Sequence, residues 1–138
     1  MLDRVLKEYP GQVRLVFKDF PLDFHTQARP AHEAARCAGE FGKYWEYHDR
    51  LFEVQPEFAR DDLIRYATEL GVPGDGFVRC LDSDRFKGLV EADVQEGRQA
   101  GIRGTPTFFI NGRPLLGAVP YEVFKEWIEE ALKERARK

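Results

Sequence analysis

The chain has 138 residues, of which 43% are hydrophobic and 33% charged, and its 21 basic and 24 acidic residues give a net charge of -3. This composition excludes disorder and suits one globular domain with one core. The acidic balance argues against a nucleic-acid-binding surface, and no uncharged apolar run is long enough to span a bilayer. The first twelve residues also lack the long apolar segment of a signal peptide. As it stands, the chain is predicted to be cytoplasmic.

Cysteine and histidine usage bears on redox and metal chemistry. The two cysteines, Cys37 and Cys80, form no C-x-x-C pair, and the three histidines form no metal-binding motif. No internal repeat and no Pro/Gly-rich linker divides the chain. The sequence therefore predicts a single domain without a metal ion or a cofactor.

The N-terminal part predicts one helix and one strand. Apolar residues at helical spacing predict a helix over residues 2–9, which a Pro-Gly pair ends. The β-branched and aromatic stretch "VRLVF" predicts a strand over residues 13–17. We interpret Asp19, which follows that strand, as a cap or turn residue in preference to a proton relay. His25, in the next loop, is interpreted as exposed in preference to lining a peptide groove.

Helical periodicity dominates the middle of the chain. Four helices are predicted, which begin near Pro30 and then cover residues 41–52, 61–70 and 75–99, the last of them broken near Asp82 and capped again by Ser83. The last of these helices is expected to bury Phe86, Leu89, Val90 and Val94. The second is expected to present one apolar stripe, on which His48 is a core or boundary residue rather than a catalytic one. That stripe consists of Phe41, Tyr44, Trp45, His48, Leu51 and Phe52.

The C-terminal part returns to strand periodicity. "TPTFFI" predicts a strand over residues 105–110, "NG" predicts a hairpin turn, "RPLLGA" predicts the returning strand, and a helix begins at Pro120. The order α, β, several helices, β, β, α predicts an α/β domain in which helices pack on a mixed sheet. Pro106 needs an explanation, because proline cannot donate a ladder hydrogen bond. From the residues alone, a trans proline at a strand start explains it.

Four segments match a known family in content and order. They are "VRLVFKDFPL", "AARCAGEFGKYWEYHDRLF", "RCLDSDRF" and "GIRGTPTFFING", of which the last is the most specific. With them the chain resembles the DsbA-like thiol–disulfide oxidoreductases. The resemblance implies a single thioredoxin-fold domain over residues 1–138, with a helical insertion at about residues 30–100.

The resemblance also implies a reaction and a site. It implies thiol–disulfide exchange on extended polypeptide substrates, together with a redox partner protein. It implies that the Thr105–Pro106 bond is cis and that Gly104, Thr105 and Pro106 bind the substrate backbone in the manner of an added strand. It further implies that Cys37 and Cys80 form a structural disulfide, the alternative being two buried free thiols.

Two family elements do not occur in the sequence. In the family, a strand that ends in C-x-x-C precedes the first helix and lies at the centre of the sheet, between the strands predicted at residues 13–17 and 105–110. We therefore expect a domain that is N-terminally truncated, has no catalytic residue and is inactive on its own. One alternative is a partner chain or swapped element that completes the sheet, as in a homo-oligomer. The other is a divergent relative that closes its sheet differently.

Three functions stay open at this point. They are a thiol–disulfide oxidoreductase, a non-catalytic peptide-binding or chaperone-like module, and an assembly completed by a partner chain. A stable disulfide would favour an oxidising compartment. An extracytoplasmic location is therefore expected if an export signal precedes Met1.

Overall fold

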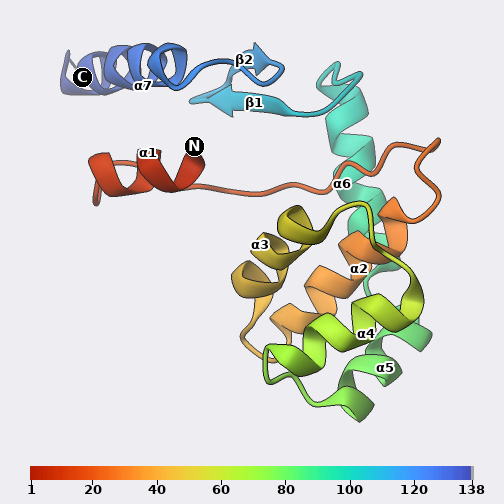
Figure 1. Cartoon of the computed structure of the whole chain (residues 1–138). Helices are drawn as coiled ribbons and strands as arrows, with labels where there is room; N and C mark the ends of the chain where they lie inside the picture. The colour runs from red at the N-terminus through yellow and green to blue at the C-terminus, as the bar shows by residue number, and fades with distance from the viewer. Residues whose placement is uncertain (138) are drawn as a thin grey trace. The chain divides into compact units, whose positions relative to one another are not determined.

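The computed structural model describes residues 1–137 and divides the chain into two compact units. The hairpin unit consists of Met1–Lys18 and of the chain from Gly101 onward. The helical unit is Asp19–Ala100, and the insertion expected at about residues 30–100 lies within this range. Figure 1 shows the helices and strands of both units.

Five helices form the helical unit: α2 (Ala28–Gly39), α3 (Tyr44–Val54), α4 (Arg60–Glu69), α5 (Gly74–Asp82) and α6 (Lys87–Gln99). The helix α2 is central, since it contacts each of the other four. The residues of its buried face have short side chains, which let the neighbouring helices approach closely. The residues of that face are Ala31, Ala34, Ala35, Cys37 and Ala38.

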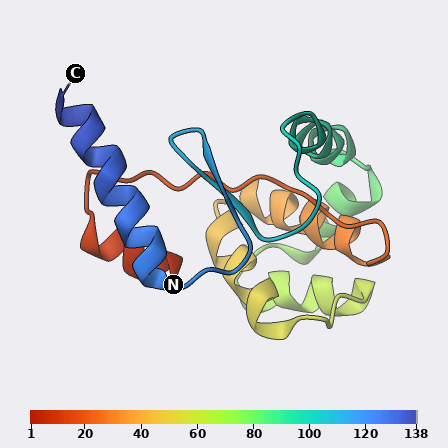
Figure 2. The ribbon, with the colours of Figure 1, turned by 90° about the horizontal axis from the view of Figure 1, so that it is seen from above.

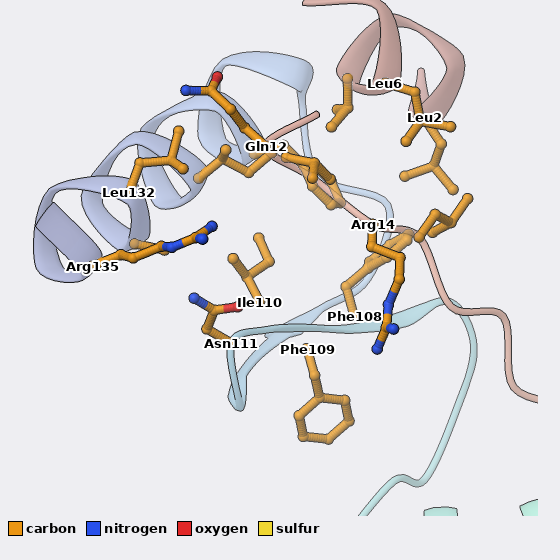
Figure 3. Close-up of a pocket in the computed structure, with 16 residues that line it drawn as sticks. Leu2, Leu6, Gln12, Arg14, Phe108, Phe109, Ile110, Asn111, Leu132 and Arg135 are labelled. Atoms are coloured by element: carbon orange, nitrogen blue, oxygen red, sulfur yellow. The ribbon is translucent and has the colours of Figure 1, made fainter. Parts of the chain in front are cut away.

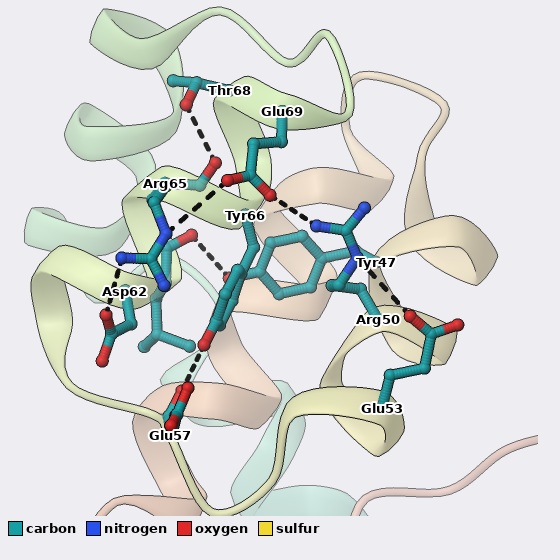
Figure 4. Close-up of polar contacts among 10 residues, drawn as sticks. Tyr47, Arg50, Glu53, Glu57, Asp62, Arg65, Tyr66, Thr68 and Glu69 are labelled. Atoms are coloured by element: carbon teal, nitrogen blue, oxygen red, sulfur yellow. Dashed lines mark hydrogen bonds and ion pairs between the residues drawn. The ribbon is translucent and has the colours of Figure 1, made fainter.

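Two tyrosines of this unit donate to backbone carbonyls, one of a neighbouring helix and one of the loop before α4 (Figure 4). Tyr47 is fully buried, and its hydroxyl donates to the carbonyl of Leu63 at 2.8 Å. Tyr66 donates in the same way to the carbonyl of Glu57 at 2.8 Å. Burial raises the pKa of the Tyr47 phenol, which therefore stays a neutral donor. On the surface above them, Arg50 pairs with Glu69 at 2.5 Å.

The structure corrects three expectations for these helices. Tyr47 faces the core from α3, whereas Trp45 and Phe52, which the predicted stripe included, are 42% and 58% exposed. The core face of α3 runs through Tyr44, Tyr47, Leu51 and Val54, so the predicted stripe was right at Tyr44 and Leu51 but was rotated toward Trp45 and Phe52. Leu89 is 51% exposed and is not part of the core. Ser83 caps the end of α5, where its hydroxyl donates to the carbonyl of Cys80, and α6 begins after Phe86.

Cys37 of α2 and Cys80 of α5 form a disulfide bond. Both are buried, with exposed fractions of 1% and 6%. Next to the bridge, α5 approaches the chain after α2 so closely that a Cβ on Gly76 would lie 2.8 Å from the Phe41 ring. The bond joins positions that are 43 residues apart in the sequence and so restricts the unfolded chain.

We predict that replacing both cysteines with serine lowers the free energy of unfolding by about 4 kcal/mol, since a loop of this length costs that much to close. Urea unfolding of the wild type and of Cys37→Ser/Cys80→Ser, each with and without reductant, measures the loss. Reductant should bring the wild type to the stability of the variant and leave the variant unchanged. Two free thiols in the folded, unreduced wild type would contradict the prediction.

The hairpin unit contains α1 (Leu2–Glu8), β1 (Thr107–Ile110), β2 (Arg113–Leu116) and α7 (Tyr121–Arg137) (Figure 2). The predicted turn is confirmed: Asn111 and Gly112 have φ of 49° and 85°, as the two-residue turn requires. The ring of Phe108 meets that of Phe124 edge-on at 4.7 Å and joins the hairpin to α7. Val5, Tyr9, Tyr121 and Ile128 form one buried cluster of the unit, in which Leu115 and Phe124 are buried as well.

The predicted mixed sheet is wrong in extent, because the described chain contains a two-stranded antiparallel sheet of β1 and β2. Residues 13–17 do not form the predicted strand. Their backbone is extended, and their side chains alternate in burial: Val13 and Leu15 are half-buried, whereas Arg14 and Val16 are exposed. The physical reason is the lack of a partner: a strand is defined by a hydrogen-bonded neighbour, and no described strand pairs with this segment.

Candidate functional site

The residues that the family resemblance marks as substrate-binding lie just before β1. The Thr105–Pro106 peptide bond is cis. The hydroxyl of Thr107 donates to the carbonyl of Gly104 at 2.7 Å, and the N–H of Gly117 donates to the carbonyl of Pro106 at 2.9 Å. These bonds hold the segment from both ends, while Thr105 and Pro106 themselves are exposed. The structure thus presents this segment on the surface of the hairpin unit.

The two cysteines do not belong to this segment. They lie in α2 and α5 of the helical unit and are bonded to each other, and the described chain has no free cysteine. Disulfide exchange requires a thiolate that can reach the disulfide of its substrate. A buried bond between two helix interiors meets neither condition, so the pair has a structural role.

Asp19 is the residue that the sequence interpretation missed. It is 2% exposed and is neither a helix cap nor a turn residue. Its carboxylate lies 2.8 Å from Nδ1 of His32 and accepts a hydrogen bond from Nε of Arg36 at 2.6 Å. Arg36 also donates to Asp93 of α6 at 2.9 Å, and the same Asp93 oxygen accepts from the backbone N–H of Asp19 at 2.9 Å.

Electrostatics favour the charged forms of Asp19 and Arg36. Burial on its own would raise the pKa of Asp19, but the hydrogen bonds and charges of His32 and Arg36 outweigh it and lower the pKa. The pKa of Arg36 is raised, because Asp19 and Asp93 oppose the effect of burial on it. Burial and the charge of Asp19 also raise the pKa of the neighbouring Tyr44. This Asp19 cluster, which consists of Asp19, His32, Arg36 and Asp93, attaches the first residue of the helical unit to α2 and α6. The sequence contained one signal for it, since His32 and Arg36 are four residues apart on one predicted helix and therefore share a face.

The other candidate positions have ordinary surroundings. His48 is half-buried on α3 among Trp45 and Phe52, with ring centroids 5.2 and 4.9 Å away, in line with a boundary residue. His25 is exposed, and its ring lies at a tilt beside that of Phe24, with centroids 4.4 Å apart. Across residues 1–137, no three acidic, histidine or cysteine side chains gather as metal ligands, and no helix is long and apolar enough to cross a membrane.

A comparison with known protein families identifies the relationship. The family model described as thioredoxin matches residues 1–130. The chain belongs to this thioredoxin family. The resemblance to DsbA-like, thioredoxin-fold oxidoreductases is thereby confirmed.

Individual relatives differ widely in length. The Na(+)/H(+) antiporter NhaA 3 of Salinispora tropica is 42% identical over 112 residues, which are 80% of this chain and 17% of the antiporter. The Na(+)/H(+) antiporter NhaA of Herminiimonas arsenicoxydans is 33% identical over 116 residues, 84% of this chain and 18% of the antiporter. The chain thus spans less than a fifth of the length of these curated relatives, and the antiporter name describes chains of which it matches only a small part.

A solved structure shows the same fold. The crystal structure of a thioredoxin-like oxidoreductase from Silicibacter pomeroyi DSS-3 superposes with a TM-score of 0.83 at 22% identity. The match covers 95% of this chain and 75% of that chain. The α/β, thioredoxin-like fold class predicted from the sequence is therefore correct, although the sheet within residues 1–137 is smaller than expected.

The Asp19 cluster makes a prediction about pH. The pKa of Asp19 is lower in the folded protein than its ordinary value of 3.8, so its contribution to stability is present above that pH and is lost as the pH falls through the folded pKa. We expect Asp19→Asn to lower the free energy of unfolding by about 3 kcal/mol at neutral pH, because it breaks a buried charge pair. Denaturant unfolding from pH 7 to pH 2 should show this gap closing in acid.

Asp23→Asn is the matched control. Asp23 is 75% exposed and lies 3.5 Å from Arg98, so its pair contributes less than about 1 kcal/mol. A gap between wild type and Asp19→Asn that stays constant down to pH 2, or one no larger than that of the control, would show that the cluster does not act through the Asp19 charge.

Proposed function

We propose that this chain is the polypeptide-binding framework of a thiol–disulfide oxidoreductase that acts on extended polypeptide substrates. The observation that carries the proposal is the segment of Gly104, Thr105 and Pro106, in which Thr105 and Pro106 are exposed and which hydrogen bonds hold at the start of β1 in a thioredoxin-family fold. Exposed backbone at the end of a strand can pair with an extended chain by strand addition. In this role Thr105 offers its backbone groups, and Gly104 leaves the approach open, since a Cβ there would meet no atom within 4 Å.

The exchange reaction itself needs a reactive thiolate. It attacks one sulfur of the substrate disulfide, forms a mixed disulfide and releases the other sulfur as a thiolate. A second cysteine of the enzyme then attacks the mixed disulfide, so that the enzyme pair is oxidised and the substrate is reduced. Residues 1–138 contain no C-x-x-C pair, and Cys37 and Cys80 are already bonded to each other. We therefore assign no catalytic residue in this chain.

We predict that the 138-residue chain reduces insulin no faster than the dithiothreitol background. Turbidity from precipitated insulin B chain measures the rate. Cys37→Ser/Cys80→Ser is the control and should give the same background rate. Turnover above background that disappears in this variant would show that Cys37 and Cys80 are catalytic.

The coding sequence upstream of Met1 separates the proposal from its alternative. An in-frame C-x-x-C there would supply the thiols, and the longer product should then reduce insulin. Without such a pair, the second candidate function is favoured: a peptide-binding or chaperone-like module without chemistry. The mutual bond between Cys37 and Cys80 supports that candidate, because it leaves no thiol for exchange.

Partners and compartment follow from the same proposal. The partners would be extended polypeptides and a redox protein that exchanges electrons with the catalytic thiols. A further possible partner is a second copy of the chain, in a homo-oligomer or a swapped dimer that completes the sheet. We place the protein in an oxidising compartment outside the cytoplasm, because disulfides such as that of Cys37 and Cys80 persist there.

A further inference from the structure

The chain on both sides of Thr105 contains positive charge and no negative charge. From Gly97 to Tyr121 the sequence has three arginines and no acidic residue, although the whole chain has a net charge of -3. Two of these arginines, Arg98 and Arg113, each form an ion pair with a carboxylate, at 3.5 and 3.0 Å. The third is Arg103, which precedes Thr105 by two residues.

Arg103 is exposed, and its side chain forms no ion pair within residues 1–137. Most other arginines of the described chain do form such a pair. A guanidinium presents its donors in a planar fork that can hold both oxygens of a carboxylate. Because no carboxylate of the described chain accepts from Arg103, its donors are available to a carboxylate of another molecule.

Arg103 is close enough to Thr105 to contact a strand that binds there. Two residues of extended chain span at most about 7 Å, so the Cα atoms of Arg103 and Thr105 are no farther apart than that. An added strand runs about 4.8 Å from the backbone with which it pairs. Gly104, which lies between the two residues, has no side chain that would cover the approach. A carboxylate on the bound strand would therefore lie within reach of the Arg103 guanidinium.

Two further arginines of the hairpin unit provide a comparison. Arg14 and Arg135 line a cavity that is bounded by α1, residues 12–15, β1 and α7 (Figure 3). From the hairpin, this cavity takes residues 108–111, which follow the Thr105 segment along the chain. Arg135 is exposed and, like Arg103, has no ion pair within the described residues. It is therefore a matched arginine of the same unit outside the substrate-binding segment.

We propose that the substrate-binding segment selects extended polypeptides with an acidic residue near the paired stretch, and that Arg103 determines this specificity. The inference rests on the proposed function, since it names the class of polypeptide that binds at Thr105. The Arg103 guanidinium donates to the carboxylate of a bound glutamate or aspartate, while Thr105 pairs with the backbone of the same strand. An exposed ion pair changes affinity only a few-fold. Arg103 thus sets a preference among polypeptides and does not decide whether one binds at all.

Fluorescence anisotropy with three labelled peptides tests this preference. The peptides alternate valine and threonine and have glutamate, glutamine or lysine near both ends, so that either strand direction brings one of these residues to Arg103. The wild-type chain should bind the glutamate peptide about threefold to fivefold more tightly than the glutamine peptide, and the lysine peptide most weakly. Added salt should reduce the difference, because it screens exposed charges.

Variants assign the preference to one side chain. Arg103→Gln should bind the glutamate and glutamine peptides equally, Arg103→Lys should keep the wild-type order, and Arg103→Glu should favour the lysine peptide. Arg135→Gln removes the same charge from the hairpin unit and should keep the wild-type order. A preference for glutamate that persists in Arg103→Gln, or that Arg135→Gln loses to the same degree, would overturn the role of Arg103.

The outcomes for the wild type separate this inference from the proposed function. Equal binding of all three peptides would overturn the inference and leave the proposed function in place. Binding of none of them would contradict the proposed function and the inference with it. Displacement of the glutamate peptide by a single-stranded oligonucleotide of equal charge, at equal concentration, would assign Arg103 to nucleic acid and overturn the polypeptide.

Discussion

Backbone pairing is the constraint on which the hairpin unit depends, because each strand N–H and C=O that leaves water requires a partner. Within residues 1–137, the strand ladder of this unit joins β1 and β2 alone. An isolated two-stranded hairpin is marginally stable, so its order must come from side chains. The edge-to-face contact of Phe108 with Phe124 supplies part of it, and the hydrogen bond from the Tyr9 hydroxyl to Glu129 joins α1 to α7. The helices thus hold the hairpin and the extended segment in place around an incomplete sheet.

The helical unit satisfies the same constraint internally. Its helices bond their own backbones, and two buried tyrosines bond carbonyls of neighbouring turns. The alanine-rich face of α2 brings its neighbours close, and the disulfide fixes α2 to α5. Asp19 adds a different kind of anchor, in which a buried charge attaches the beginning of the unit to α2 and α6. This unit therefore has a complete core, and its stability should not depend on an added strand.

Prediction from the sequence succeeded where local signals decide the structure. The break after Asp82, the Asn111–Gly112 turn and the extent of α7 were predicted from turn chemistry and period and agree with the structure, although Ser83 caps the end of α5 and not the start of α6. It failed where a distant partner decides. Residues 13–17 have strand propensity and alternating burial, yet no described strand pairs with them. Asp19 was misjudged for a related reason: its role depends on Arg36 and on Asp93, 74 positions away. The position of the Thr105–Pro106 segment could be predicted, but only through the family resemblance.

Family membership and chemistry are carried by different residues in this chain. The match to the thioredoxin family extends over residues 1–130 and includes no C-x-x-C pair. Exchange of disulfides, in contrast, depends on two sulfur atoms at one helix end, and a fold retains its packing without them. The sulfurs that residues 1–137 contain are already used to connect two helices. A structural disulfide is buried, whereas a reactive dithiol must be accessible to its substrate. Cys37 and Cys80 could therefore take part in exchange only if the packing of α2 against α5 were lost.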